Sequence, residues 1–251
     1  ADLMTGPKQT PGTKKCVQIP GKIVKIYATV KQLADNKREK VMVKKLLDTA
    51  KVSGNTKVAK TGKKGMPFGG NVRMAQLSMM PDSILCAGSK AAGCMDLCLK
   101  DAGLAAVYRS VNIARQARTD FWHADREELS NFTKLCDKQG VKGVVRLNVL
   151  SDIAWEEHNI PQDFPSLYFY DYTKRAKRLG KDKTPANYDL MFSYSARHQY
   201  RKQVLMAVCH DNPIAVVFKS KMPDTFLGRD VIDGDQSDLT NVYAGKVVIG
   251  L

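Results

Sequence analysis

The pattern of apolar and polar positions divides this chain into strand-like and helix-like stretches that alternate along it. Short apolar or β-branched runs predict strands at residues 22–30, 73–80, 144–149, 167–170, 189–193, 214–218, 231–233 and 246–249. Helical spacing of apolar residues is found over residues 31–52, 95–102, 104–139, 173–179 and 199–208. Within the first of these, Val43, Leu46, Leu47 and Ala50 fall on one helical face.

This alternation favours an α/β fold built on a parallel sheet. Several strands are short and almost continuously apolar, which is typical of strands buried under helices in a parallel sheet. Repeated strand–helix units predict a partial or complete (β/α) barrel. We find no sequence repeat and no internal linker that demands a second core. We therefore expect a basic N-terminal segment over residues 1–65 and one barrel-like domain over residues 66–251.

The positive charge of the chain is concentrated in its N-terminal quarter. The net charge is +15, and residues 1–65 contain 16 lysines and arginines against four acidic residues, which accounts for +12. Local positive charge favours polyanions through counterion release, so DNA or RNA is a candidate partner of residues 1–65. A solvated basic face that only aids solubility explains the same charge. Few aromatic residues interleave with these lysines, which argues against a platform for base stacking.

Three of the six cysteines lie within thirteen residues that follow the predicted strand at 73–80. Cys86, Cys94 and Cys98 have the spacing C-x7-C-x3-C, and mainly small residues separate the first two. Small residues let the backbone turn tightly and leave room between the thiols. The pattern predicts a metal site, for which a four-iron, four-sulphur cluster is the favoured occupant. The alternative is three reduced cysteines in a glycine-rich turn.

Polar residues follow the other predicted strands. In parallel α/β folds, ligands bind beyond the carboxyl ends of the strands, so these residues and the cysteine loop are expected at one rim. Candidates for catalysis are Arg146, Asn148, Asp152, Asp171 and Lys174. Candidates for holding a cofactor or substrate are Ser193, Ser195, Lys219, Asp233 and Asp235.

Each group of candidates has a structural alternative. Arg146 and Asp152 could form an ion pair that only stabilises the fold. Asp171, with Thr173 and Lys174, could cap a helix that starts there. The stretch Asp233–Asp238 (DGDQSD) resembles part of a calcium loop, but without the closing Glu a polar turn is favoured. The fourth cluster ligand stays open among Cys16, Cys136 and Cys209.

Several motifs together are similar to the gene product 88 family of phage and plasmid proteins. They are Lys60-Thr-Gly62, the loop Cys86–Cys98, Val145–Asp152 (VRLNVLSD), Phe169–Lys174 (FYDYTK) and Asp233-Gly-Asp235. The resemblance covers roughly residues 60–240. This chain has Ser151 where the family usually has Gly, and Leu99 where Tyr is common. The resemblance implies a phage or mobile-element origin and a metal cluster, without an established activity.

The strand followed by a three-cysteine loop also resembles the layout of radical S-adenosylmethionine enzymes. Those enzymes typically have C-x3-C-x2-C, from which C-x7-C-x3-C departs, and no Gly-Gly-Glu motif is present to hold the methionine amino group. S-Adenosylmethionine is therefore a second, weaker cofactor candidate.

Two functions follow from these observations. The first is a phage-type iron–sulphur protein; whether it is an enzyme stays open, and an open iron site would suit redox or radical chemistry. The second is a nucleic-acid-binding phage protein whose zinc or iron–sulphur site is purely structural. The lack of an eighteen-residue apolar run and the bunched cysteines indicate a cytoplasmic protein that does not enter the membrane. The phage resemblance implies that this is the cytoplasm of the host cell.

Overall fold

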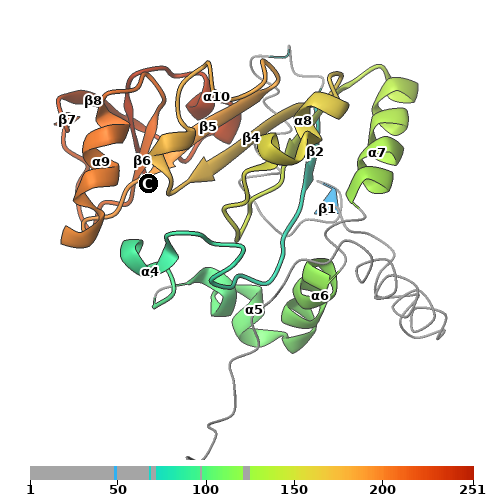
Figure 1. Cartoon of the computed structure of the whole chain (residues 1–251), viewed down its shortest axis with the longest axis horizontal. Coiled ribbons are helices and arrows are strands. Elements are labelled where there is room, and N and C mark those ends of the chain that lie inside the picture. The colour runs from blue at the N-terminus through green and yellow to red at the C-terminus, as the bar shows by residue number, and fades with distance from the viewer. Residues whose placement is uncertain (1–47, 50–67, 69–71, 97, 121–124) are drawn as a thin grey trace, which may run out of the picture. The chain divides into compact units, whose positions relative to one another are not determined.

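The computed structural model describes residues 48–49, 68, 72–96, 98–120 and 125–251 (Figure 1). All of them belong to one compact unit, residues 42–251. The strand expected at 22–30 and the boundary expected after residue 65 lie outside the described residues. The described strands are β1 (Asp48–Thr49), β2 (Val72–Gln76), β3 (Lys142–Arg146), β4 (Tyr168–Thr173), β5 (Tyr188–Ser193), β6 (Ile214–Val216), β7 (Thr225–Phe226), β8 (Arg229–Asp233) and β9 (Val248–Gly250).

Helices connect the strands or flank them. The described α-helices are α4 (Ser89–Ala92), α5 (Leu104–Val107), α6 (Arg109–Asp120), α7 (Asp125–Gln139), α8 (Ile160–Asp163), α9 (Arg201–Val208) and α10 (Asp238–Val242). Short 3-10 turns are η1 (Leu99–Asp101), η3 (Trp155–His158), η4 (Ala176–Arg178) and η5 (His198–Tyr200).

The described strands form one sheet in the order β1-β2-β3-β4-β5-β6-β9-β8-β7. The seven inner strands, from β2 to β8 in this order, pair in parallel, and β1 and β7 pair antiparallel at the two ends. The predicted parallel α/β fold is confirmed. The sheet is open, since β1 and β7 are its two ends among the described strands and no described strand joins them, so it is not a complete barrel.

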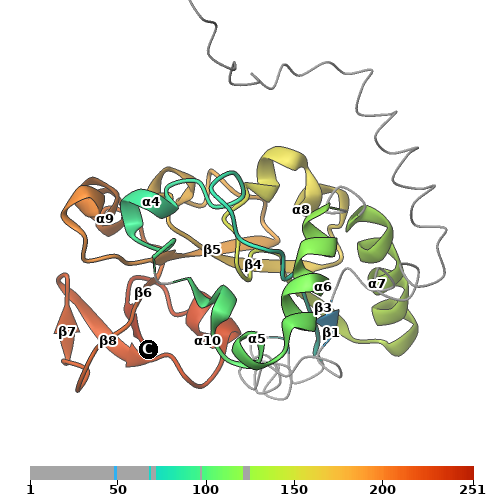
Figure 2. The same ribbon diagram turned by 90° about the horizontal axis from the view of Figure 1, so that it is seen from below.

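Apolar side chains cover both faces of the sheet. A row of strand residues in register faces α7, α8 and α9: Ala75, Val145, Phe169 and Tyr188, continued by Phe192, Ile214 and Val248. Figure 2 shows these helices on one side of the sheet and α10 on the other. The face under α10 contains Met74, Val144 and Met191. Burial on both faces explains why the strands are almost uniformly apolar in sequence.

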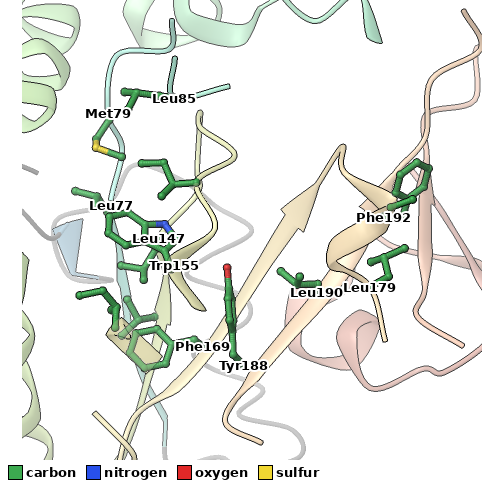
Figure 3. Packing of buried hydrophobic residues seen from close by; sticks show 14 of the residues in the cluster. Leu77, Met79, Leu85, Leu147, Trp155, Phe169, Leu179, Tyr188, Leu190 and Phe192 are labelled. Carbon is green, nitrogen blue, oxygen red and sulfur yellow. The ribbon is translucent and has the colours of Figure 1, made fainter. Parts of the chain in front are cut away.

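The large cluster also contains side chains from the loops after β2 and β3. Trp155 is fully buried with Leu77, Met79 and Leu147 (Figure 3). Its indole Nε1 donates a hydrogen bond to Asn148 Oδ1 at 3.1 Å, which satisfies its polar atom within the core. The carboxyl edge of the sheet is therefore packed rather than open at β2 and β3.

Several predicted elements differ from the structure. Residues 48 and 49 are a strand and do not continue a helix. The described residues of the helical stretch expected from 104 to 139 form α5, α6 and α7, and Tyr108 separates α5 from α6. The helix expected over 173–179 is wrong: Thr173 ends β4, where it is in register with Phe192 of β5, and only η4 follows. No helix among the described residues has the length and apolarity needed to span a membrane.

Candidate functional site

The cysteine loop follows β2 and starts with a turn built by one aspartate. The Asp82 carboxylate accepts hydrogen bonds from the backbone N–H groups of Ile84 and Leu85, both at 2.7 Å. Two glycines then reverse the chain around α4, with φ of 88° at Gly88 and 77° at Gly93. Left-handed φ values favour glycine, so the small residues that separate the first two cysteines have a backbone role.

The loop lies across the carboxyl ends of β3 and β5. The backbone N–H of Asp152 donates to the carbonyl oxygen of Leu85 at 2.8 Å, and the Cys86 thiol donates to the carbonyl oxygen of Leu150 at 3.3 Å. At the other end of the loop, Ser195 Oγ donates to the carbonyl oxygen of Ala92 at 2.8 Å. Segments 64 to 103 residues apart in the chain thus hold the loop over one edge of the sheet.

The three thiols are close enough to interact electrostatically. Burial, together with negative charge at Asp152 and Cys98, raises the pKa of Cys86 to about 12. Burial also raises the pKa of Cys94; the Lys174 ammonium lowers it, whereas Cys98 raises it. Cys98 therefore acts on both other thiols. A bound cation would stabilise thiolates that burial alone disfavours.

The three thiols are the right chemical type of ligand for an iron–sulphur cluster, but they are not arranged around a common metal position. Thiolates are the ligands that such clusters use, and all three thiols are free. Within the part of the chain that the structure describes, no group of three or more His, Cys, Asp or Glu side chains is arranged to hold a metal ion. The loop would have to draw its three thiols inward to bind a cluster.

The two other described cysteines do not join this loop. Cys136 is buried in α7 beside Gly143, at the start of β3, and Cys209 is exposed where α9 ends before β6. In a parallel sheet, residues at the start of a strand lie at the amino edge, opposite the loop. Cys16 lies outside the described residues.

A buried polar network lies beneath the loop and includes the predicted site residues Asn148, Asp152 and Asp171. Arg178 Nη1 pairs with Asp152 Oδ1 at 2.7 Å, and their side chains are 2% and 7% exposed. Arg178 also pairs with Glu156 at 2.7 Å and donates to the Tyr188 hydroxyl at 3.0 Å. The contacts of Arg178 alone join residues that are up to 36 positions apart in the sequence.

The Tyr188 hydroxyl extends this network to the second predicted aspartate. It donates to Asp171 Oδ2 at 2.9 Å, and the backbone N–H of Asn148 donates to Asp171 Oδ1 at 2.6 Å. Burial raises the pKa of Asp171 to about 7, although these hydrogen bonds lower it. Asp171 therefore caps no helix. Its hydrogen bonds join the loop that follows β3 to strands β4 and β5.

Lys174 lies at the end of β4 beside the cysteine loop. Its backbone N–H donates to Asp152 Oδ2 at 2.9 Å, and its ammonium donates to the carbonyl oxygen of Tyr194 at 2.8 Å. Burial lowers the pKa of Lys174, while negative charge at Cys94 and Asp152 raises it. Asp152, Lys174 and the cysteines are thus brought together as the strand-end argument predicts.

Arg146 is on the other side of the sheet, which corrects its expected place in this group. Its Nη1 lies 3.4 Å from Asp238 Oδ2, and its guanidinium lies 4.6 Å from the ring centroid of Tyr172. Successive strand residues point to opposite faces, so Arg146 faces α10 whereas Val145 faces the larger cluster. An Arg146–Asp152 ion pair is also wrong, since the partner of Asp152 is Arg178.

The remaining predicted residues lie at strand ends without a described contact to the thiols. Ser193 ends β5, and Lys219 is exposed after β6. Asp233 and Asp235 are exposed in a polar turn, where Asp233 Oδ1 accepts a hydrogen bond from the backbone N–H of Asp235 at 2.9 Å. This is the turn geometry that the sequence favoured over a calcium loop.

Sequence reasoning missed Arg178, Arg197 and Tyr200. Arg178 is one of four basic residues in Lys174–Arg178 (KRAKR), and nothing in that run marks which one is buried. Arg197 pairs with Asp96 at 2.6 Å and lies over Gly93, where a Cβ atom would come within 2.1 Å of its Nε. The glycine in the cysteine loop was the one available signal for this close approach.

The comparison with protein families decides the classification. The sequence model described as gene product 88 matches residues 44–250. The chain belongs to the gene product 88 family. The family resemblance inferred from its motifs is thereby confirmed, over a longer stretch than the motifs covered. No curated protein and no solved structure matches this gene product 88 protein, so the likeness to radical S-adenosylmethionine enzymes gains no support.

Proposed function

We propose that this gene product 88 protein is an iron–sulphur protein of the host cytoplasm in which Cys86, Cys94 and Cys98 supply three ligands. One observation carries the proposal: three free thiols of a single loop, which turns at two glycines, lie together at the carboxyl edge of a parallel sheet. They are near enough that negative charge at Cys98 raises the pKa of both Cys86 and Cys94. Ligand sites of parallel α/β folds are found at this edge. A four-iron cluster is the favoured type.

A cluster held in this way would supply one-electron chemistry, and an iron without a protein ligand would leave room for a substrate. The residues of the chain would set the conditions for that chemistry. Asp82 and Asp152 hold the loop in place, and Lys174 brings positive charge beside Cys94. A redox or radical reaction is the reaction class that this arrangement favours.

The test is to prepare the protein without oxygen, reconstitute it, and measure iron, sulphide, visible absorbance and paramagnetic resonance. We expect brown protein with about four irons per chain, in line with a four-iron cluster. Cys86→Ser, Cys94→Ser and Cys98→Ser should each lose most of the iron. Cys209→Ser is the matched control, because Cys209 is exposed at the end of α9, and it should keep the iron. Colourless, iron-free wild-type protein would end the proposal.

The charge of residues 1–65 favours a second function, binding of DNA or RNA with a metal that is purely structural. The segment carries +12 of the net charge of +15. Binding measured by fluorescence anisotropy should weaken steeply with salt, with a slope that reflects the number of phosphates neutralised. Replacing four lysines of this segment by glutamine should flatten the slope, whereas four exposed lysines of residues 66–251 serve as the control. Equal effects of the two sets would contradict this function.

A further inference from the structure

Two hydrogen-bond donors beside the cysteine loop have unused capacity. The Lys174 ammonium has three N–H groups, and its described side-chain hydrogen bond is the one to the carbonyl oxygen of Tyr194. It forms no ion pair with any carboxylate of the described residues. Tyr200 is 2% exposed, and its hydroxyl has no hydrogen-bond partner in the described part of the chain.

The two groups are neighbours. The Lys174 Nζ lies 6.0 Å from the centroid of the Tyr200 ring. That ring stacks on Phe192 of β5, with centroids 6.0 Å apart and planes within 7°, so its position is fixed by the core. Both groups also lie near Cys94 and Asp152, whose charges act on each of them.

The surrounding acidic groups are already engaged. Asp152 accepts hydrogen bonds from the Thr173 hydroxyl, the backbone N–H of Lys174 and the Arg178 guanidinium. Asp96 pairs with Arg197. Burial is costly for an ammonium with one described acceptor and for a hydroxyl with none among the described residues, and a ligand that accepts hydrogen bonds and carries negative charge would give both groups a further partner.

We propose that Lys174 and Tyr200 bind an oxyanion group of the substrate, a carboxylate or a phosphate, beside the cysteine loop. The ammonium supplies charge and the phenol a directed hydrogen bond, the combination that anionic oxygens favour. The inference rests on the proposed function in one respect: the rest of the substrate would face the iron–sulphur cluster proposed for the cysteine loop. Binding of the oxyanion itself requires no cluster.

Isothermal titration calorimetry of the full chain tests this site, first with inorganic phosphate and then with acetate, each in a chloride buffer. We expect saturable binding of one of the two anions, which identifies the class of oxyanion. Lys174→Met and Tyr200→Phe should each weaken that binding about tenfold, as loss of one charge-assisted hydrogen bond does. Lys202→Met is the matched control, because Lys202 is an exposed lysine of α9, and it should bind as the wild type does.

A second measurement keeps the proposal testable if Lys174→Met fails to fold. Without added anion, Tyr200→Phe should unfold at the same urea concentration as the wild type or a higher one, since it removes a hydroxyl that no described residue pairs with. Tyr188→Phe should unfold at a lower concentration, because the Tyr188 hydroxyl contacts Asp171 and Arg178. With saturating anion, the wild type should gain stability and Tyr200→Phe should gain less.

The outcomes separate this site from the cluster. Saturable binding to iron-free protein supports the oxyanion site even if reconstitution yields no cluster. A cluster without anion binding, or binding that Lys202→Met weakens as much as Lys174→Met does, would overturn the oxyanion site and leave the iron–sulphur proposal standing.

Discussion

The backbone N–H of Asp152 donates a hydrogen bond to the carbonyl oxygen of Leu85 at 2.8 Å. Leu85 precedes the first cysteine of the loop, and the side chain of Asp152 is paired with buried Arg178. The position of the cysteine loop therefore depends on an ion pair beneath it. Breaking that pair should affect both the stability of the fold and the loop.

Asp152→Asn should lower the free energy of unfolding by about 3 kcal/mol, because it removes one of the two carboxylates that pair with the buried Arg178. Asp163→Asn is the matched control: Asp163 pairs with Arg126, and about half of each side chain is exposed. The control should cost less than about 1 kcal/mol. Urea denaturation measures both, and similar losses in the two variants would show that the Asp152–Arg178 pair has no special role.

Asp171 should make stability depend on pH. Burial raises its pKa from 3.8 to about 7, so the folded protein binds this proton more tightly than the unfolded chain does. The contribution to stability is present below about pH 4 and is lost as the pH rises through 7, at up to about 1.4 kcal/mol per pH unit.

Asp171→Asn removes this titration, so the difference in unfolding free energy between wild type and variant should grow as the pH falls from 7 to 5. Urea denaturation across that range measures it. Asp182→Asn, which changes a fully exposed carboxylate, should show a constant difference. A constant difference for Asp171→Asn as well would mean that Asp171 stays ionised in the folded protein.

Gly93→Ala should destabilise the cysteine loop more than Gly88→Ala does. Both glycines have positive φ, so alanine costs about 1–2 kcal/mol at either position. Only at Gly93 would the new Cβ meet the Arg197 guanidinium, whereas nothing lies within 4 Å at Gly88. Thermal unfolding should give a lower midpoint for Gly93→Ala than for Gly88→Ala. Adding Arg197→Ala to Gly93→Ala should reduce this difference in midpoint. A difference that stays the same in the double variant would rule out the clash as its cause.

Replacing Arg229 by lysine should destabilise the protein. Its buried guanidinium donates to the carbonyl oxygens of Val208 at 2.9 Å and Asn212 at 2.8 Å, and so satisfies the end of α9 and the turn that follows. A lysine ammonium cannot reach both carbonyl oxygens as the forked guanidinium does. Arg229→Lys should therefore lower the free energy of unfolding, measured by urea denaturation, by about 1–2 kcal/mol. Arg201→Lys, at an exposed position of α9, should stay within about 0.5 kcal/mol of the wild type.

Much of the fold could be predicted because buried parallel strands leave apolar runs in the sequence. Each described strand from β2 to β6 overlaps a predicted one, and two of the polar residues after them, Asp152 and Lys174, are hydrogen-bonded to each other at one edge. The helix expected at 173–179 failed because pairing of β4 with β5 extends the strand through Thr173. Its helical spacing was outweighed by hydrogen bonds to a strand that starts fifteen residues later.

The sequence alone determined the parallel α/β class, the family, and the grouping of the cysteine loop with Asp152 and Lys174, because these depend on local pattern and on the order of strands. Only the tertiary structure decided that Arg146 faces Asp238, that Arg178 is the partner of Asp152, and that the Tyr200 hydroxyl has no hydrogen-bond partner among the described residues. Both faces of this sheet are apolar, so the alternation that would assign a side chain to one face is missing from the sequence. Partners across the sheet depend on strand register, which forms only when the chain folds.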